Sequence, residues 1–194
     1  MSNSGTIQRA DTQRYDGVAQ SFHWLVVLLV IAQYATQWLP DGFASLTEKQ
    51  LDGWHIAIGP AVLLIMLLRL AWRFTHPAPP PPSDLPISLR ILSRGTHYLF
   101  YAILIVLPVL GWIAASGYGS DVSLLKLVPL PALIAKNKSL AESVGSVHGA
   151  LAWALLGIIA LHVSGALYHG LVKQDGVIRR MIPGAIDPPP HSST

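Results

Sequence analysis

Four long apolar segments limit most strongly how this chain can fold, and they span about residues 22–39, 55–74, 96–115 and 147–172. Each is close to the roughly 20 residues that an α-helix needs to cross about 30 Å of hydrocarbon. Apolar residues make up 52% of the chain and charged residues only 12%, which is not the composition of a water-soluble domain. Because backbone polar groups in lipid must be satisfied within their own segment, we expect helices. The sequence predicts an all-α membrane protein, a single four-transmembrane-helix bundle over residues 1–194.

Basic residues are distributed unevenly over the predicted loops. Of the 13 Lys and Arg residues, nine fall on the side that carries both termini and the second loop, and four fall on the other side. Positive charge favours the cytoplasmic side, so we expect both termini in the cytoplasm and the chain in a bacterial inner membrane as a multi-pass protein. The net charge of +3 is spread over these loops, so it is a topology signal and predicts no nucleic-acid partner.

The third predicted loop, residues 117–146, is the longest connection. Its apolar stretch, residues 124–135, is interrupted by Pro129 and Pro131 and is too short and too broken to span the membrane. We therefore expect this stretch to lie on the outer surface or to cap the bundle.

Six of the eight histidines lie in or at the ends of the apolar segments: His23, His55, His97, His148, His162 and His169. An ionisable side chain inside a span is costly, which makes each of them a candidate functional residue. The alternative for any single one is an interfacial residue or a hydrogen bond to a neighbouring helix.

Helical spacing places two of these histidines on one face of the fourth segment. His148 and His162 are fourteen residues apart, so on a helix they lie at two depths about 21 Å apart. In the predicted topology His55 lies at the depth of His148, and His23 lies towards the depth of His162. The sequence thus predicts an outer pair, His55 with His148, and an inner pair, His23 with His162, each able to hold a haem iron between two imidazoles. His97 is the alternative to His23.

The absence of cysteine excludes iron–sulfur clusters and covalently attached c-type haem, so any haem is bound noncovalently. Zinc is the rival occupant, but it prefers four ligands, and no Asp or Glu within the predicted spans completes such a set. Small residues flank the candidate histidines and allow either close approach of a flat macrocycle or ordinary helix packing: Gly59, Gly145, Gly149 and Gly165.

Several short motifs occur together along nearly the whole chain: Ser21-Phe22-His23-Trp24-Leu25, Gly53-Trp54-His55, Leu68-Arg69-Leu70-Ala71-Trp72-Arg73, Leu107-Pro108-Val109-Leu110-Gly111, Val147-His148-Gly149 and Leu161-His162. In this combination the sequence resembles the bacterial cytochrome b-561 family, small four-helix dihaem proteins related to the b subunits of nickel hydrogenases and formate dehydrogenases. The resemblance implies two noncovalent b haems and electron exchange with ubiquinone or another quinone. One branch of the family oxidises superoxide while it reduces ubiquinone.

The function favoured by these features is electron transfer between a periplasmic donor, superoxide or a redox protein, and the quinone pool. Two histidines on each iron leave no vacant position for oxygen, so the protein is expected to act as an oxidoreductase that relays electrons. Two other functions stay open: a haem b anchor subunit that connects a separate redox enzyme to quinone, and a histidine-based proton or metal transporter.

Three further residues complete the predicted site. Arg69 and Arg73 are expected either to neutralise the propionates of the inner haem or simply to mark the cytoplasmic side. His169 comes seven residues after His162, which places it on nearly the same face and about 10 Å nearer the cytoplasm. There it is expected to exchange a proton with quinone, the alternative being an interfacial histidine that bonds water or a propionate.

Overall fold

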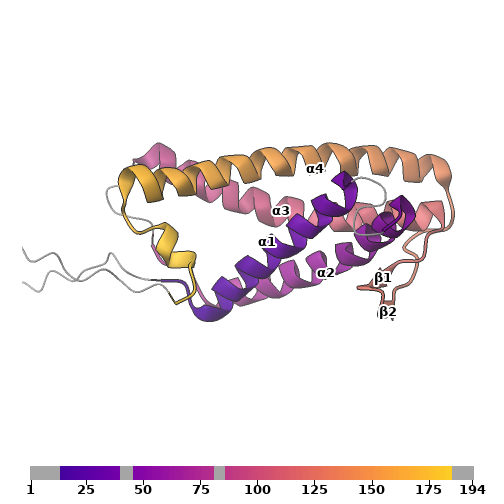
Figure 1. The fold of residues 1–194 in the computed structure, drawn as a ribbon, viewed down its shortest axis with the longest axis horizontal. Coiled ribbons are helices and arrows are strands. Elements are labelled where there is room, and N and C mark those ends of the chain that lie inside the picture. Colours follow the sequence, from indigo (N-terminus) through magenta and orange to yellow (C-terminus); the bar gives the residue numbers. More distant parts are fainter. Residues whose placement is uncertain (1–13, 40–45, 81–85, 185–194) are drawn as a thin grey trace, which may run out of the picture.

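Four long helices form the molecule, and the computed structural model describes residues 14–39, 46–80 and 86–184. The helices run along the long axis of the molecule and are α1 (Gly17–Trp38), α2 (Glu48–Thr75), α3 (Ile87–Tyr118) and α4 (Lys138–Leu167) (Figure 1). Between α3 and α4 lies a hairpin of two short antiparallel strands, β1 (Ser123–Leu124) and β2 (Val128–Pro129). A π-helical turn, Tyr168–Lys173, and a 3-10 turn, Ile178–Met181, follow α4. All four helices are long and apolar enough to cross a membrane, which confirms the predicted four-span fold.

Each helix begins well before the apolar segment that predicted it, because its first turns are polar. Asp16 caps α1 by accepting a 2.9 Å hydrogen bond from the amide of Ala19. Thr47 and Gln50 form a reciprocal capping box at the start of α2. The third helix begins at residue 87 and the fourth at residue 138, so the predicted loop 117–146 is in fact confined to residues 119–137.

Because the helices start earlier than predicted, three histidines lie further inside them than expected. His55, His97 and His148 were expected at the beginnings of their segments, and each lies instead two or more turns inside its helix. Helical residues therefore precede and follow each of these histidines in the chain, which fixes the backbone from which its side chain projects.

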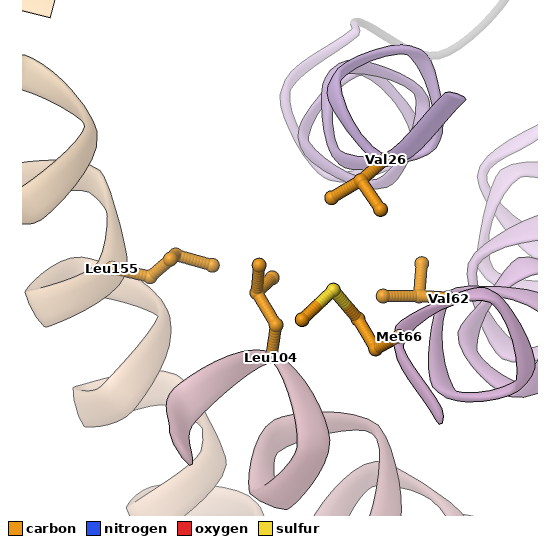
Figure 2. Close-up of a cluster of buried hydrophobic side chains, with 5 residues drawn as sticks. All are labelled: Val26, Val62, Met66, Leu104 and Leu155. Carbon is orange, nitrogen blue, oxygen red and sulfur yellow. The ribbon is translucent and has the colours of Figure 1, made fainter. Parts of the chain in front are cut away.

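The helices pack directly in chain order, α1 on α2, α2 on α3 and α3 on α4. Between them lies a core of buried apolar side chains, Val26, Val62, Met66, Leu104 and Leu155 (Figure 2). Apart from this core, most apolar side chains face outward, as expected for helices surrounded by lipid.

The first and last spans meet mainly through side chains. At one end of the bundle Tyr34 Oη donates a 2.7 Å hydrogen bond to the carbonyl of Ala152, and the rings of Trp38 and Trp153 lie 6.0 Å apart. The bundle is thus closed between α1 and α4 by long side chains and not by direct helix packing.

The segment after α4 returns to the start of α1. Gln20 Nε2 and Trp24 Nε1 donate hydrogen bonds of 3.0 and 2.8 Å to the carbonyls of Arg180 and Met181. The described ends of the chain therefore share one end of the bundle, which we call the terminal end, and the β-hairpin lies at the other, the hairpin end (Figure 1). That the terminal end faces the cytoplasm stays a prediction.

Candidate functional site

Two histidines from helices that are not packed directly against each other meet towards the hairpin end. The ring centroids of His55 in α2 and His148 in α4 lie 6.0 Å apart, with their planes at 78°. Both side chains are half-buried, and the structure brings together the two residues that the sequence predicted as the outer pair.

Carbonyl groups on neighbouring helices fix the orientation of both rings. His55 Nδ1 lies 3.2 Å from the carbonyl oxygen of Gln33 and 3.2 Å from Thr36 Oγ1, and His148 Nδ1 lies 3.0 Å from the carbonyl oxygen of Leu107. A carbonyl oxygen can only accept, so His148 Nδ1 carries the ring proton and donates it. In the tautomer that donates to the Gln33 carbonyl, His55 Nδ1 does the same; the side-chain amide of Gln33, 3.0 Å away, is its competing partner. Each Nε2 is then left with a free lone pair, which is the form of histidine that ligates a metal.

A glycine on α3 gives His148 room for this position. A Cβ added at Gly111 would lie 3.1 Å from Cε1 and 3.3 Å from Nδ1 of His148. These contacts are shorter than ordinary van der Waals separation, so any larger residue at position 111 would push the imidazole ring away. The sequence motif that ends at Gly111 therefore shapes this site through its last residue.

The second pair lies towards the terminal end, where α1 faces α4. The ring centroids of His23 and His162 are 6.3 Å apart, with their planes at 62°. The ring of Phe100 in α3 lies 5.3 Å from His162 and closes one side of the pair. The structure thus also brings together the two residues that the sequence predicted as the inner pair.

His97 lies beside this second pair and is its geometric rival. Its ring centroid is 5.5 Å from that of His162, and its Nδ1 donates a 2.7 Å hydrogen bond to the carbonyl of Ser93, one turn earlier in α3. However, α3 packs directly along α4, whereas α1 reaches α4 mainly through side chains. A flat macrocycle is more readily accommodated between α1 and α4 than between two helices in contact.

Arg69 is a cation in contact with the second pair. Its Nη1 lies 3.4 Å from His23 Nδ1, and its guanidinium lies 5.9 Å from the ring centre of Tyr101. A guanidinium only donates, so here His23 Nδ1 is the acceptor, opposite to the Nδ1 atoms of His55 and His148. Arg73 is one turn further along α2, with its guanidinium 5.9 Å from the ring centre of Tyr15, at the terminal end.

These contacts allow a test of whether a bis-histidine haem fits the residues. A metal held between two imidazoles by bonds of about 2 Å places the ring centroids roughly 6 Å apart. The separations of 6.0 and 6.3 Å match this value, and each pair joins helices that do not pack directly. Among residues 14–39, 46–80 and 86–184, no three or more His, Cys, Asp or Glu side chains are grouped so that they could hold a metal ion. The residues present fit two-ligand haem sites.

The glycines beside the histidines are not needed for helix packing. A Cβ added at Gly145, Gly149 or Gly165 would meet nothing within 4 Å, and one at Gly59 would meet only the side chain of Gln33, at 3.5 Å. Of the two interpretations given by the sequence, close packing of small residues therefore does not account for their presence.

His169 forms the remaining polar contact of the predicted site. In the π-helical turn after α4, His169 Nδ1 lies 2.5 Å from Asp175 Oδ2, and both side chains are mostly buried, with 17% and 21% of their surface exposed. Asp175 Oδ1 also accepts a 3.2 Å hydrogen bond from the amide of Val177. His169 is thus one of a paired set of groups able to hold and pass on a proton.

Sequence reasoning missed the groups that orient the candidate ligands. Backbone carbonyls of apolar helices carry no side-chain signal, so Gln33 and Leu107 had no feature that marked them out. Asp175 had a weak signal, because it is an acidic residue six positions after a histidine near the end of a span.

Known proteins match this chain along most of its length. A family model described as prokaryotic cytochrome b561 matches residues 14–184. Cytochrome b561 homolog 2 of Escherichia coli (strain K12) is 28% identical over 178 residues, which cover 88% of this chain and 92% of that protein. The probable superoxide oxidase CybB of Yersinia pestis is 30% identical over 176 residues, 88% of this chain and 97% of that protein. Cytochrome b561 homolog 1 of Escherichia coli is 26% identical over 169 residues.

Proposed function

Since the chain belongs to the prokaryotic cytochrome b561 family, we propose that it is a two-haem oxidoreductase that carries electrons between a donor at its hairpin end and quinone near its terminal end. Membership makes it a multi-pass membrane cytochrome of b type that takes part in electron transfer. The number of haems, their ligands, the quinone and a position in the bacterial inner membrane are our proposal.

The observation that carries the proposal is the presence of two opposed histidine pairs at two depths, both completed by α4. Bound haem supplies one-electron redox chemistry at each pair. Leu155 lies seven residues from both His148 and His162, and with Met66 it belongs to the apolar core between the two depths. This arrangement favours two separate sites over one shared site.

At the hairpin end His55 and His148 act as ligands through Nε2. Their Nδ1–H groups donate to the carbonyls of Gln33 and Leu107, which holds the rings in place and keeps each ligating nitrogen basic. A haem held between these two imidazoles would pass electrons and would not bind oxygen.

At the terminal end His23 and His162 are the proposed ligands, and the ring proton of His23 must move. If His23 held a haem through Nε2, its proton would lie on Nδ1, which could no longer accept from Arg69. The Arg69 guanidinium would then be free to donate to a propionate carboxylate. Arg73, one turn further along α2, has the same charge at the same end.

His169 is the proposed proton donor to quinone, with Asp175 as the group that orients it. In the imidazolium form of His169, the carboxylate of Asp175 accepts from Nδ1–H, and Nε2–H is the proton left to pass to a quinone oxygen; Nε2 must then take up another proton before the next transfer. Reduction of a quinone requires protons as well as electrons, which favours a site where a proton-exchanging pair lies one to two turns beyond His162.

Superoxide is the donor we favour, because a relative of similar length is named as a probable superoxide oxidase. Lysines at the hairpin end would attract an anion, among them Lys126, Lys136 and Lys138. Lys138 is partly neutralised by Glu142, 3.7 Å away, whereas Lys126 lies 4.0 Å from the ring centre of Trp54, next to His55.

The absorption spectrum of the purified chain, with haem counted per protein, tests the proposal. We expect two b haems, with His55→Ala or His148→Ala removing one and His23→Ala or His162→Ala removing the other. His97→Ala, the matched control, should keep both. A colourless protein after haem-replete expression, or members of one pair removing different haems, would overturn the assignment. Quinone reduction by superoxide with the chain alone then distinguishes an independent enzyme from an anchor subunit.

A further inference from the structure

The β-hairpin between α3 and α4 has a tip, residues 125–128, whose three apolar side chains no part of the proposed electron transfer uses. Leu124 pairs with Val128, and the intervening turn places Leu125 and Lys126 at positive φ, 51° and 59°. Side chains other than glycine adopt this backbone conformation at a cost, so the surrounding contacts must hold the turn in place.

The hairpin tip is held against the side of α2. The amide of Leu125 donates a 2.9 Å hydrogen bond to the carbonyl of Ala57, and Lys126 Nζ lies 4.0 Å from the ring centre of Trp54. Figure 1 shows the hairpin folded back beside the helices and not projecting beyond the hairpin-end tips of α3 and α4. The tip therefore lies alongside the bundle, at a depth that α2 defines.

That depth is the edge of the hydrocarbon. Trp54 and Trp72 are eighteen residues apart on α2, about 27 Å along the axis, which is close to the thickness of the bilayer core. Tryptophans at such positions mark the two membrane interfaces. Ala57 lies nearly one turn inward of Trp54, so the tip meets α2 at or just inside the interface.

The side chains of the tip suit lipid better than water. Leu127 is 81% exposed, Val128 50% and Leu125 38%. Three apolar side chains displayed together on a fixed turn would be costly in water but suit the boundary between headgroups and acyl chains.

Backbone amides of the hairpin are also hydrogen-bonded within the protein, as an apolar environment requires. The amides of Leu125, Leu127 and Leu130 donate to the carbonyls of Ala57, Leu124 and Val122, each at 2.9 Å. Pro129 and Pro131 have no amide hydrogen. A segment that touches lipid needs its donors satisfied in this way.

We propose that the hairpin tip, residues 125–128, inserts into the membrane leaflet at the hairpin end, with phospholipid as its partner. Leu127 and Val128 contact acyl chains, and the ammonium of Lys126, held over Trp54, lies at the level of the lipid phosphates. The third connection of the bundle is thus a lipid anchor. This inference needs no haem and stands independently of the proposed function.

Spin labelling tests the anchor, and the absence of native cysteine makes each label unique. Leu127→Cys in the full, haem-loaded chain would be labelled with a nitroxide and placed in vesicles of phosphatidylethanolamine and phosphatidylglycerol. Collision rates with oxygen, which concentrates in acyl chains, and with a water-soluble nickel complex are then compared. Leu28→Cys, in the middle of α1 and 63% exposed, is the lipid reference, and the exposed Ser139→Cys, in the first turn of α4, is the water reference.

We expect the ratio of oxygen to nickel collisions at residue 127 to be several-fold above that at residue 139 and close to that at residue 28. A ratio equal to that at residue 139 would show a water-exposed hairpin and overturn the proposal. Protection from both reagents, with spin–spin broadening between labels, would mean that a second copy of the chain covers the tip, and would also overturn it. Repeating the measurement with Val128→Cys guards against a local distortion at residue 127.

Discussion

At the scale of single residues, His148 owes its position to the missing side chain of Gly111. A Cβ at residue 111 would lie 3.1 Å from His148 Cε1, so the ring must shift by a small amount for alanine and by more for valine. We expect Gly111→Ala to weaken haem retention at the hairpin-end pair and Gly111→Val to abolish it, while the second haem stays. Haem content and the reduced spectrum measure this, with Gly157→Ala, on α4 but not beside a candidate histidine and with nothing within 4 Å of its added Cβ, as the control. Full haem content in Gly111→Val would contradict it.

His169 and Asp175 allow a prediction on quinone chemistry. His169→Ala should leave both haem spectra intact and slow quinone reduction at least about tenfold, because a positioned general acid contributes rate and not haem affinity. Asp175→Asn should have a smaller effect of the same kind, since it removes only the group that orients the ring. Rapid mixing of reduced protein with a soluble quinone gives the rate. Unchanged turnover would exclude His169 and leave Tyr168 or His97 as candidates.

The candidate histidines could be predicted from the sequence, whereas the backbone carbonyls that orient them could not. A histidine inside an apolar segment is conspicuous because of its cost, and fourteen-residue spacing on one helix specifies two depths. The carbonyls of Gln33 and Leu107 that orient His55 and His148 belong to ordinary helical backbone. Their role depends on how α1 and α3 pack, which is a property of the tertiary structure.

At the scale of elements, the helix starts depend on caps that lie outside the apolar runs. Thr47 accepts from the amide of Gln50, and the side chain of Gln50 accepts from the amide of Thr47. We expect Thr47→Ala to lower the free energy of unfolding by about 1 kcal/mol and to speed amide exchange in the first turn of α2. Thr47→Ser, which keeps the hydroxyl, should leave the free energy of unfolding and the amide exchange rate close to those of the unchanged protein. Thermal unfolding in detergent and hydrogen exchange at Leu51 would detect the change, and equal stability of all three proteins would rule out a role for the cap.

The apolar runs predicted the four helices but not their lengths, for a physical reason. Hydropathy reports the part of a helix that touches lipid, while the polar turns at its ends extend into the interface and are fixed by capping residues such as Asp16, Thr47 and Asn137. The β-hairpin had no hydropathy signal of its own, because its strands contain two residues each. The shortness of the apolar stretch, residues 124–135, and its prolines indicated only that the segment does not span the membrane.

At the scale of the whole molecule, the described chain ends share one end of the bundle, and the side of the membrane they face is open to test. Nine of 13 basic residues on that side predict the cytoplasm. A reporter that is active only in the periplasm, fused after the last residue, should therefore be silent. A thiol at Ser139→Cys should react with an impermeant maleimide added outside spheroplasts. Strong reporter activity with a protected thiol would reverse the orientation.

Both histidine pairs require α4, the last of the four spans to leave the ribosome. While the first three spans are being made, the membrane holds His23, His55 and His97 without either α4 partner. If the proposed ligation holds, a chain that stalls or is cleaved before α4 contains neither complete pair and should bind neither haem stably. A complete pair at either depth can arise only when all four spans have been translated, so on the proposed ligation haem uptake would report that translation has reached the end of α4.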